Sequence, residues 1–117
     1  MEQVRRPDDG ELLGFVARDA EGWSARTVFH GELARGASRE EAYDVVRARG
    51  LASLAERWHW YSRRTGRWEV VVLQEAVPGR VTAAVGYYSL PQSPTVRITA
   101  DDLAAGDRLS PWSSPPA

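Results

Sequence analysis

Hydrophobic and polar residues alternate in two short stretches near the start of the chain. Leu12–Arg18 and Trp23–Phe29 each have the composition and alternation of a strand. Asp19 and Gly22 between them suit the first and last positions of a type I turn. The pattern predicts a β-hairpin. A Gly-containing connection follows, with a short strand expected at Glu32–Arg35.

A helical pattern occupies residues 38–49. Ser38 and Glu41 have the spacing of a capping box, in which each side chain bonds the backbone amide of the other. The apolar face expected to pack on a sheet consists of Ala42, Val45 and Val46. Gly50 is predicted to end the helix in the left-handed conformation, with Leu51 contacting the last turn in a Schellman motif.

The stretch from Arg57 to Tyr88 holds three of the five tryptophans and three of the four tyrosines. Its strand-forming residues predict strands at Arg57–Arg63, Trp68–Ala76 and Val81–Ser89. A two-residue loop at Thr65-Gly66 would place Trp58 opposite Leu73, Trp60 opposite Val71, His59 opposite Val72 and Tyr61 opposite Val70. The tryptophans would then lie on one face of the sheet, and His59 and Tyr61 on the other.

These elements predict an α+β fold. We expect a mostly antiparallel sheet of about five strands with one main helix packed on it, in the order ββαβββ. The predicted domain spans residues 11–109, between a flexible N-terminal lead at 1–10 and a Pro/Ser-rich tail at 110–117. A further short strand is expected at Thr95–Thr99, and Thr99 is expected to cap a brief helix through Ala105.

Composition excludes several kinds of chemistry. The chain has no cysteine, which excludes thiol catalysis, and its 15 basic residues are all arginine, which excludes lysine-dependent phosphate loops and Schiff bases. The two histidines, His30 and His59, lack any metal-ligand spacing. We therefore expect no catalytic residues, no metal and no cofactor, and predict that the protein is not an enzyme.

The same composition bears on origin and location. Arginine in place of lysine, with no asparagine and one isoleucine, is typical of a high-GC genome and predicts a bacterial source. The N-terminal residues lack the apolar region of a signal peptide, and no apolar run is long enough for a membrane helix. The expectation is a cytoplasmic protein with no membrane partner.

One strand carries the strongest candidate surface. Basic and aromatic residues alternate on one face of Arg57–Arg63, and two more arginines flank the turn. The candidate binding residues are Arg57, His59, Tyr61, Arg63, Arg64 and Arg67. Tyr, Trp and Arg are favoured anchors in protein interfaces, and the same mixture can stack on single-stranded bases. A net charge of −1 favours a protein partner over nucleic acid.

Trp112 lies in the proline-rich tail and completes the candidate set. An exposed tryptophan there would be costly to leave in water. It is expected either to fold back on its own domain or to anchor a partner.

One set of residues spans the hairpin, the connection and the helix start: Asp19, Gly22 and Trp23, then Gly36, then Ser38-Arg39-Glu40-Glu41-Ala42. On these residues, positions 14–42 resemble the first half of a HicB-type antitoxin domain. The chain lacks the Leu-Pro-Gly element expected before that helix and an appended DNA-binding motif. The resemblance implies a small protein that binds and masks a toxin.

Three functions therefore remain in view. The first is a non-catalytic protein-interaction domain, adaptor-like or antitoxin-like, with a protein partner or a second copy of itself. The second is a small nucleic-acid-binding domain that uses the same Arg/aromatic face. The third is a small-ligand pocket between the helix and the sheet.

Overall fold

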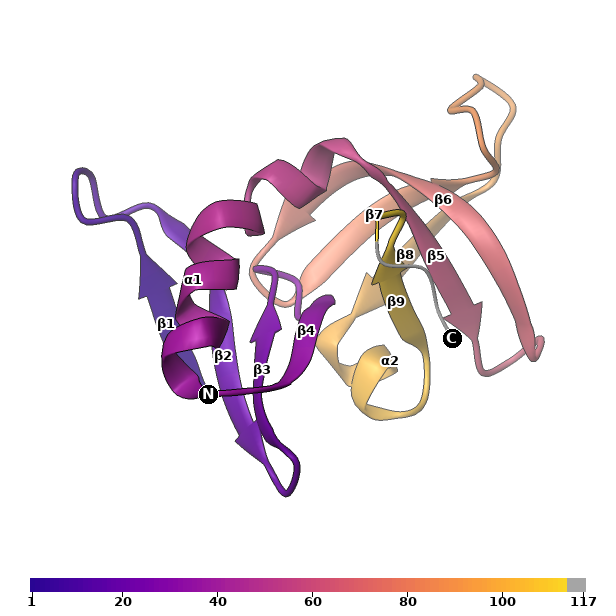
Figure 1. Cartoon of the computed structure of the whole chain (residues 1–117). Coiled ribbons are helices and arrows are strands. Elements are labelled where there is room, and N and C mark those ends of the chain that lie inside the picture. Colours follow the sequence, from indigo (N-terminus) through magenta and orange to yellow (C-terminus); the bar gives the residue numbers. More distant parts are fainter. Residues whose placement is uncertain (114–117) are drawn as a thin grey trace.

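The computed structural model describes residues 1–113 (Figure 1). Its elements, in chain order, are β1 (Glu2–Arg5), β2 (Leu12–Asp19), β3 (Gly22–Arg26), β4 (Glu32–Ala37), α1 (Arg39–Arg49), the 3-10 helix η1 (Ala52–Ala55), β5 (Arg57–Ser62), β6 (Arg67–Val77), β7 (Arg80–Val85), β8 (Thr95–Thr99), α2 (Ala100–Ala104) and β9 (Arg108–Pro111). They form two antiparallel sheets, ordered β1-β2-β3-β4 and β8-β7-β6-β5-β9.

The α+β class is confirmed, but the prediction of one sheet in the order ββαβββ is wrong. The strands preceding the main helix form a separate four-stranded sheet. Residues 1–10, expected as a flexible lead, contribute β1, which pairs with β2. One apolar side chain, Val4, secures this strand, and its exposure is 1%. A strand with a single buried residue among polar neighbours leaves no recognisable alternation in the sequence.

The start of α1 follows the sequence prediction. The Glu41 amide donates to Ser38 Oγ at 3.1 Å, and the Ser38 amide donates to Glu41 Oε1 at 3.3 Å, so both halves of the capping box are present. Ala42 and Val46 are buried against the first sheet, and Val45 is half-buried.

The end of α1 differs from the prediction. Gly50 has φ −54° and ψ −52°, which is right-handed helical backbone, so the Schellman ending is wrong. The chain instead continues into η1. The need for glycine is steric, because a Cβ atom at this position would lie 2.3 Å from the carbonyl oxygen of Leu13 on β2.

The pairing of β5 with β6 is displaced by two residues from the predicted register. Trp58 lies opposite Val71, and Tyr61 lies opposite Trp68. The loop between the strands spans residues 63–66 rather than two residues. Because side chains alternate with a period of two, a shift of two changes every partner and keeps every face. The predicted separation of Trp58 from Tyr61 is therefore confirmed.

Two buried residues from the first half of the chain join the two sheets. They are Val28 and Phe29, in the connection between β3 and β4, and we call them the plug because they fill the common core between the sheets. The Phe29 ring meets the Trp58 ring edge-on at 5.4 Å. The Gly79 amide, in the β6–β7 turn, donates to the Val28 carbonyl at 2.9 Å. The plug fixes the second sheet against the first.

The C-terminal segment is also more ordered than expected. Residues 108–111 form β9, which pairs with β5, so part of the predicted tail belongs to the second sheet. The Ser113 amide and hydroxyl both donate to Glu56 Oε1 at 2.9 Å. Residues 114–117 of the predicted tail lie outside the described residues. Within residues 1–113, no helix is long and apolar enough to cross a membrane.

Candidate binding face

The outer face of β9, β5 and β6 brings the main candidate residues together. Directly opposed residues of an antiparallel pair share a face, so the register defines three rows across these strands. The rows are Arg108, Tyr61 and Trp68; Ser110, His59 and Val70; and Trp112, Arg57 and Val72. We call these nine residues, together with Tyr87 and Tyr88, whose rings lie against Arg57, the outer face. None of them is acidic.

An arginine and four aromatic rings make up one end of the outer face. The Arg57 guanidinium carbon lies 3.8 Å from the Tyr87 ring centroid, and Arg57 Nε donates to the Tyr87 carbonyl at 2.7 Å. Trp112 stacks on His59, with centroids 4.8 Å apart and planes at 13°. The Tyr87 ring meets both Trp112 and Tyr88 edge-on. Trp112 therefore folds back on its own sheet, yet 45% of it remains exposed.

A second cluster occupies the opposite end of the same face. The Tyr61 and Trp68 rings lie 5.5 Å apart, and the Arg108 guanidinium carbon lies 5.4 Å from the Trp68 centroid. Within residues 1–113, neither Arg57 nor Arg108 forms an ion pair with a carboxylate. Both cations lie against aromatic rings, where a cation–π contact holds them without neutralising them.

Arg63 does not belong to the outer face. Its guanidinium pairs with Asp107 at 2.9 Å and with Asp102 at 3.2 Å. These contacts raise the Arg63 pKa, with the Asp107 hydrogen bond the largest cause. Arg64 and Arg67 are exposed at the β5–β6 loop beside the face. The predicted surface thus divides into Arg57, His59, Tyr61 and Trp112 on the face, two flanking arginines, and one structural arginine.

Asp107 is the centre of the network that holds Arg63. The carboxylate is 8% exposed and accepts from the Arg63 amide at 3.0 Å and from Trp60 Nε1 at 3.1 Å, besides the guanidinium. Asp102 completes the capping box of α2, in which Thr99 is the N-cap. The hydrogen bond from the Thr99 amide, followed by smaller contributions from the Thr99 hydroxyl and Arg63, lowers the Asp102 pKa. Since that pKa is lower in the folded chain, the stabilisation is present above the ordinary carboxyl pKa and is lost as pH falls through the folded value.

Replacing Asp107 by asparagine is expected to lower the free energy of unfolding by about 1–3 kcal/mol, because an amide removes the charge that three donors share and offers one acceptor oxygen instead of two. Urea unfolding measures the loss. Asp101→Asn, at an exposed neighbour in the first turn of α2, is the matched control and should change stability by less than about 0.5 kcal/mol. Equal effects of the two substitutions would contradict the role assigned to Asp107.

Charge is segregated along the chain, although the net charge is close to zero. Residues 1–56 contain eight arginines and eleven carboxylates, whereas residues 57–117 contain seven arginines and five carboxylates. The net charges of these parts are therefore −3 and +2. In the second part, Asp102 and Asp107 are paired with Arg63, and Glu75 is paired with Arg80. The outer face is locally cationic, which the net charge of the chain conceals.

Sequence reasoning missed three contributors to this face. Tyr87 and Tyr88 follow β7 at Gly86, and their exposures are 45% and 65%. Arg108 lies on β9, a strand that the proline-rich composition concealed. The tyrosine pair was visible as two adjacent aromatics before a Pro/Ser-rich stretch, but no local pattern indicates that the chain returns them to β5.

The two histidines lie in different surroundings. His59 lies on the outer face beneath Trp112, and His30 is half-buried beside Phe15, with ring centroids 5.1 Å apart. Among residues 1–113, no group of three or more His, Cys, Asp or Glu side chains is arranged to hold a metal ion. The side chains gathered on the outer face can stack, donate hydrogen bonds and attract negative charge.

Comparison of the chain with protein-family models, with curated proteins and with solved structures gives no match. Functional inference therefore depends on the surface itself.

Proposed function

We propose that this protein is a non-catalytic interaction domain whose outer face binds an acidic linear segment of a partner protein. The observation that carries the proposal is the composition of the three rows: exposed aromatics and unneutralised arginines with no carboxylate among them. Tyr, Trp and Arg are the residues that dominate binding energy in protein interfaces. A cationic aromatic surface is complementary to a peptide that carries carboxylates and apolar side chains.

The size of the face supports a short segment rather than a globular surface. Adjacent strands are about 4.8 Å apart, and residues on one face repeat about every 6.8 Å along a strand. Three strands and three rows therefore span roughly 10 by 14 Å. A standard interface between globular proteins buries about 800 Å² on each partner, several times this area. A few residues of extended peptide match the available surface.

Replacing Arg57 or Tyr87 by alanine is expected to weaken binding of acidic peptides at least tenfold, because truncation of an aromatic or arginine anchor at an interface hot spot typically removes 2 kcal/mol or more. The measurement is fluorescence anisotropy with labelled peptides selected from a random linear library. Leu90→Ala is the matched control, since Leu90 is 51% exposed but lies outside the rows. Thermal unfolding of each variant separates lost binding from lost folding.

Two outcomes would contradict this function. One is selection of peptides without acidic residues. The other is affinity that Arg57→Ala and Tyr87→Ala leave unchanged. A second copy of the chain as the occupant would appear as concentration-dependent dimerisation in sedimentation, abolished by the same two substitutions.

Nucleic acid is the second candidate, and the segregated positive charge favours it. The exposed rings of Trp68 and Trp112 could each stack on an unpaired base. Two arginines on the face would neutralise about two phosphates and give a logarithmic salt slope of about −1.4. Single-stranded oligonucleotides titrated at several salt concentrations test this function. Affinity that does not change with salt concentration, or no binding at all, would contradict a nucleic-acid-binding function.

An antitoxin-like role is one form of the proposed interaction domain. The resemblance over residues 14–42 implies a toxin as the partner. Under our proposal the toxin would present its acidic segment to the outer face, which lies in the other half of the chain.

A further inference from the structure

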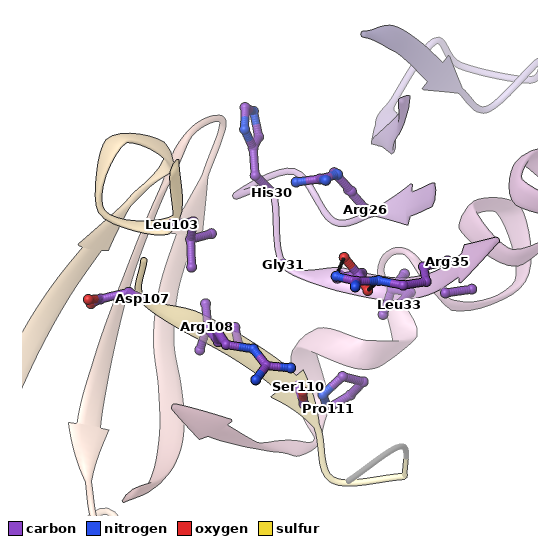
Figure 2. A pocket seen from close by; sticks show the side chains of 13 residues that line it. Arg26, His30, Gly31, Leu33, Arg35, Leu103, Asp107, Arg108, Ser110 and Pro111 are labelled. Carbon is purple, nitrogen blue, oxygen red and sulfur yellow. Dashed lines mark hydrogen bonds and ion pairs between the residues drawn. The ribbon is translucent and has the colours of Figure 1, made fainter. Parts of the chain in front are cut away.

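A cleft lies where the two sheets meet, away from α1. It has a volume of about 280 Å³ and opens between β4 and β9, each the terminal strand of its sheet (Figure 2). This cleft lies between two sheet edges, whereas the third candidate function placed its pocket between the helix and the sheet. In a terminal strand, alternate backbone N–H groups face the free edge, where no neighbouring strand uses them. The charged and titratable residues of its lining are Arg26, His30, Glu32, Arg35, Asp107 and Arg108.

The charges in this cleft do not cancel. The Glu32 carboxylate accepts hydrogen bonds from Arg35 Nε at 2.7 Å and from a terminal guanidinium nitrogen of Arg35 at 2.9 Å, so these two charges neutralise each other. Asp107 is occupied by Arg63 and Trp60 on its other side. Within residues 1–113, Arg26 and Arg108 form no ion pair with a carboxylate. Arg26 lines the cleft, and Arg108, whose guanidinium also lies against the Trp68 ring on the outer face, borders it.

Arg26 and His30 are held in place at one end of the cleft. Arg26 Nε donates to Ser24 Oγ at 3.1 Å, and Figure 2 shows its guanidinium directed toward His30. His30 has φ 71°, the one positive φ of a non-glycine residue within residues 1–113. Such backbone costs about 1–3 kcal/mol and persists where the surroundings enforce it. Here the Thr27–Gly31 turn enforces it through three hydrogen bonds of 2.8–3.0 Å.

The imidazole of His30 complements the arginine. Burial, followed by the nearby Arg26 charge, lowers the His30 pKa. At neutral pH the ring is therefore uncharged, and it can donate one hydrogen bond to a ligand without adding a charge that must be desolvated.

We propose that this cleft binds a small phosphorylated ligand. The Glu32–Arg35 pair shows that one carboxylate satisfies one guanidinium through a bidentate contact. Two guanidiniums without a carboxylate partner, Arg26 in the lining and Arg108 at the border with the outer face, call for a ligand with more charge and more acceptor oxygens. A phosphate group carries about −1.5 to −2 charges and three acceptor oxygens at neutral pH. The cleft volume lies just below the range of pockets that bind drug-sized molecules, so the ligand must be small.

The test is a titration of the full chain with inorganic phosphate, pyrophosphate and acetate at constant ionic strength, followed by amide NMR shifts. Pyrophosphate is expected to shift residues 26–35 and 108–111 and to bind more tightly than phosphate, while acetate leaves these residues unchanged. Arg26→Gln should weaken pyrophosphate binding by about tenfold to a hundredfold, the effect of one charge-assisted hydrogen bond. Arg18→Gln, an exposed arginine on β2, is the control and should bind as the wild type does.

Three results would overturn the proposal. The first is the absence of shifts with about 10 mM pyrophosphate, well above the concentration at which a millimolar site fills. The second is a shift pattern centred on Arg57 and Trp112, which would place the anion on the outer face. The third is unchanged affinity in Arg26→Gln. Because the wild-type shift map locates the site by itself, a poorly folded variant does not obscure the answer. The peptide experiment on the outer face substitutes Arg57 and Tyr87, and this one substitutes Arg26. Either site can therefore fail alone, even though Arg108 and Ser110 border both.

Discussion

Replacing Trp58 by alanine is expected to lower the free energy of unfolding by about 3–5 kcal/mol, the usual loss for a buried tryptophan. Trp58 is 0% exposed and is the largest fully buried side chain. Its ring meets Phe29 of the plug, and its Nε1 donates to the Ser53 carbonyl at 2.9 Å. The substitution leaves a cavity between the two sheets and a buried carbonyl without its donor. In a protein with a total stability of roughly 5–15 kcal/mol, this loss lowers the melting temperature by about 10–20 °C.

Two companion variants separate the contributions at this position. Trp58→Phe keeps an aromatic ring against Phe29 and removes the indole donor, so it should cost less than the alanine variant. Trp68→Ala deletes a tryptophan that is 38% exposed, and it should cost about 1 kcal/mol or less. The measurement is urea unfolding followed by circular dichroism. Similar losses at Trp58 and Trp68 would show that the plug does not hold the two sheets together.

Replacing Gly50 by alanine is expected to destabilise the protein by about 2 kcal/mol or more, the cost of forcing an extra methyl group into a filled site. Helix propensity alone predicts that Gly50→Ala would raise the stability of the protein. Gly50 has helical backbone, and alanine is favoured over glycine there by about 1 kcal/mol. The structure decides the sign, because the new methyl group would lie 2.3 Å from the Leu13 carbonyl oxygen. Either α1 or β2 must move.

The control for Gly50 lies in the same helix. Ala48 is exposed, so Ala48→Gly reports propensity without a tertiary contact and should cost about 1 kcal/mol. Thermal and urea unfolding of the two variants give the comparison. A gain of stability in Gly50→Ala would show that α1 does not approach β2 as closely as described here.

The outer face was partly predictable. The alternation of Arg57, His59 and Tyr61 within one strand placed them on a common face, and that relation survived a two-residue error in register. Trp112 was recognised as an exposed tryptophan that needs a contact, but the choice between its own domain and a partner required the position of β9. Arg63 has the same spacing as its neighbours, yet Asp107, 44 residues later, removes it from the face.

The sequence by itself determined several local elements, and its lack of cysteine and lysine excluded chemistry that needs those side chains. The capping boxes at Ser38 and Thr99, the hairpin at residues 12–26 and the faces of β5 depend on neighbours a few residues apart, so local spacing was sufficient. Tertiary structure alone decided the number of sheets, the pairing of β9 with β5, and the meeting of β4 with β9 that forms the cleft. These features arise from contacts between distant segments, and their stability comes from buried area that no local pattern records.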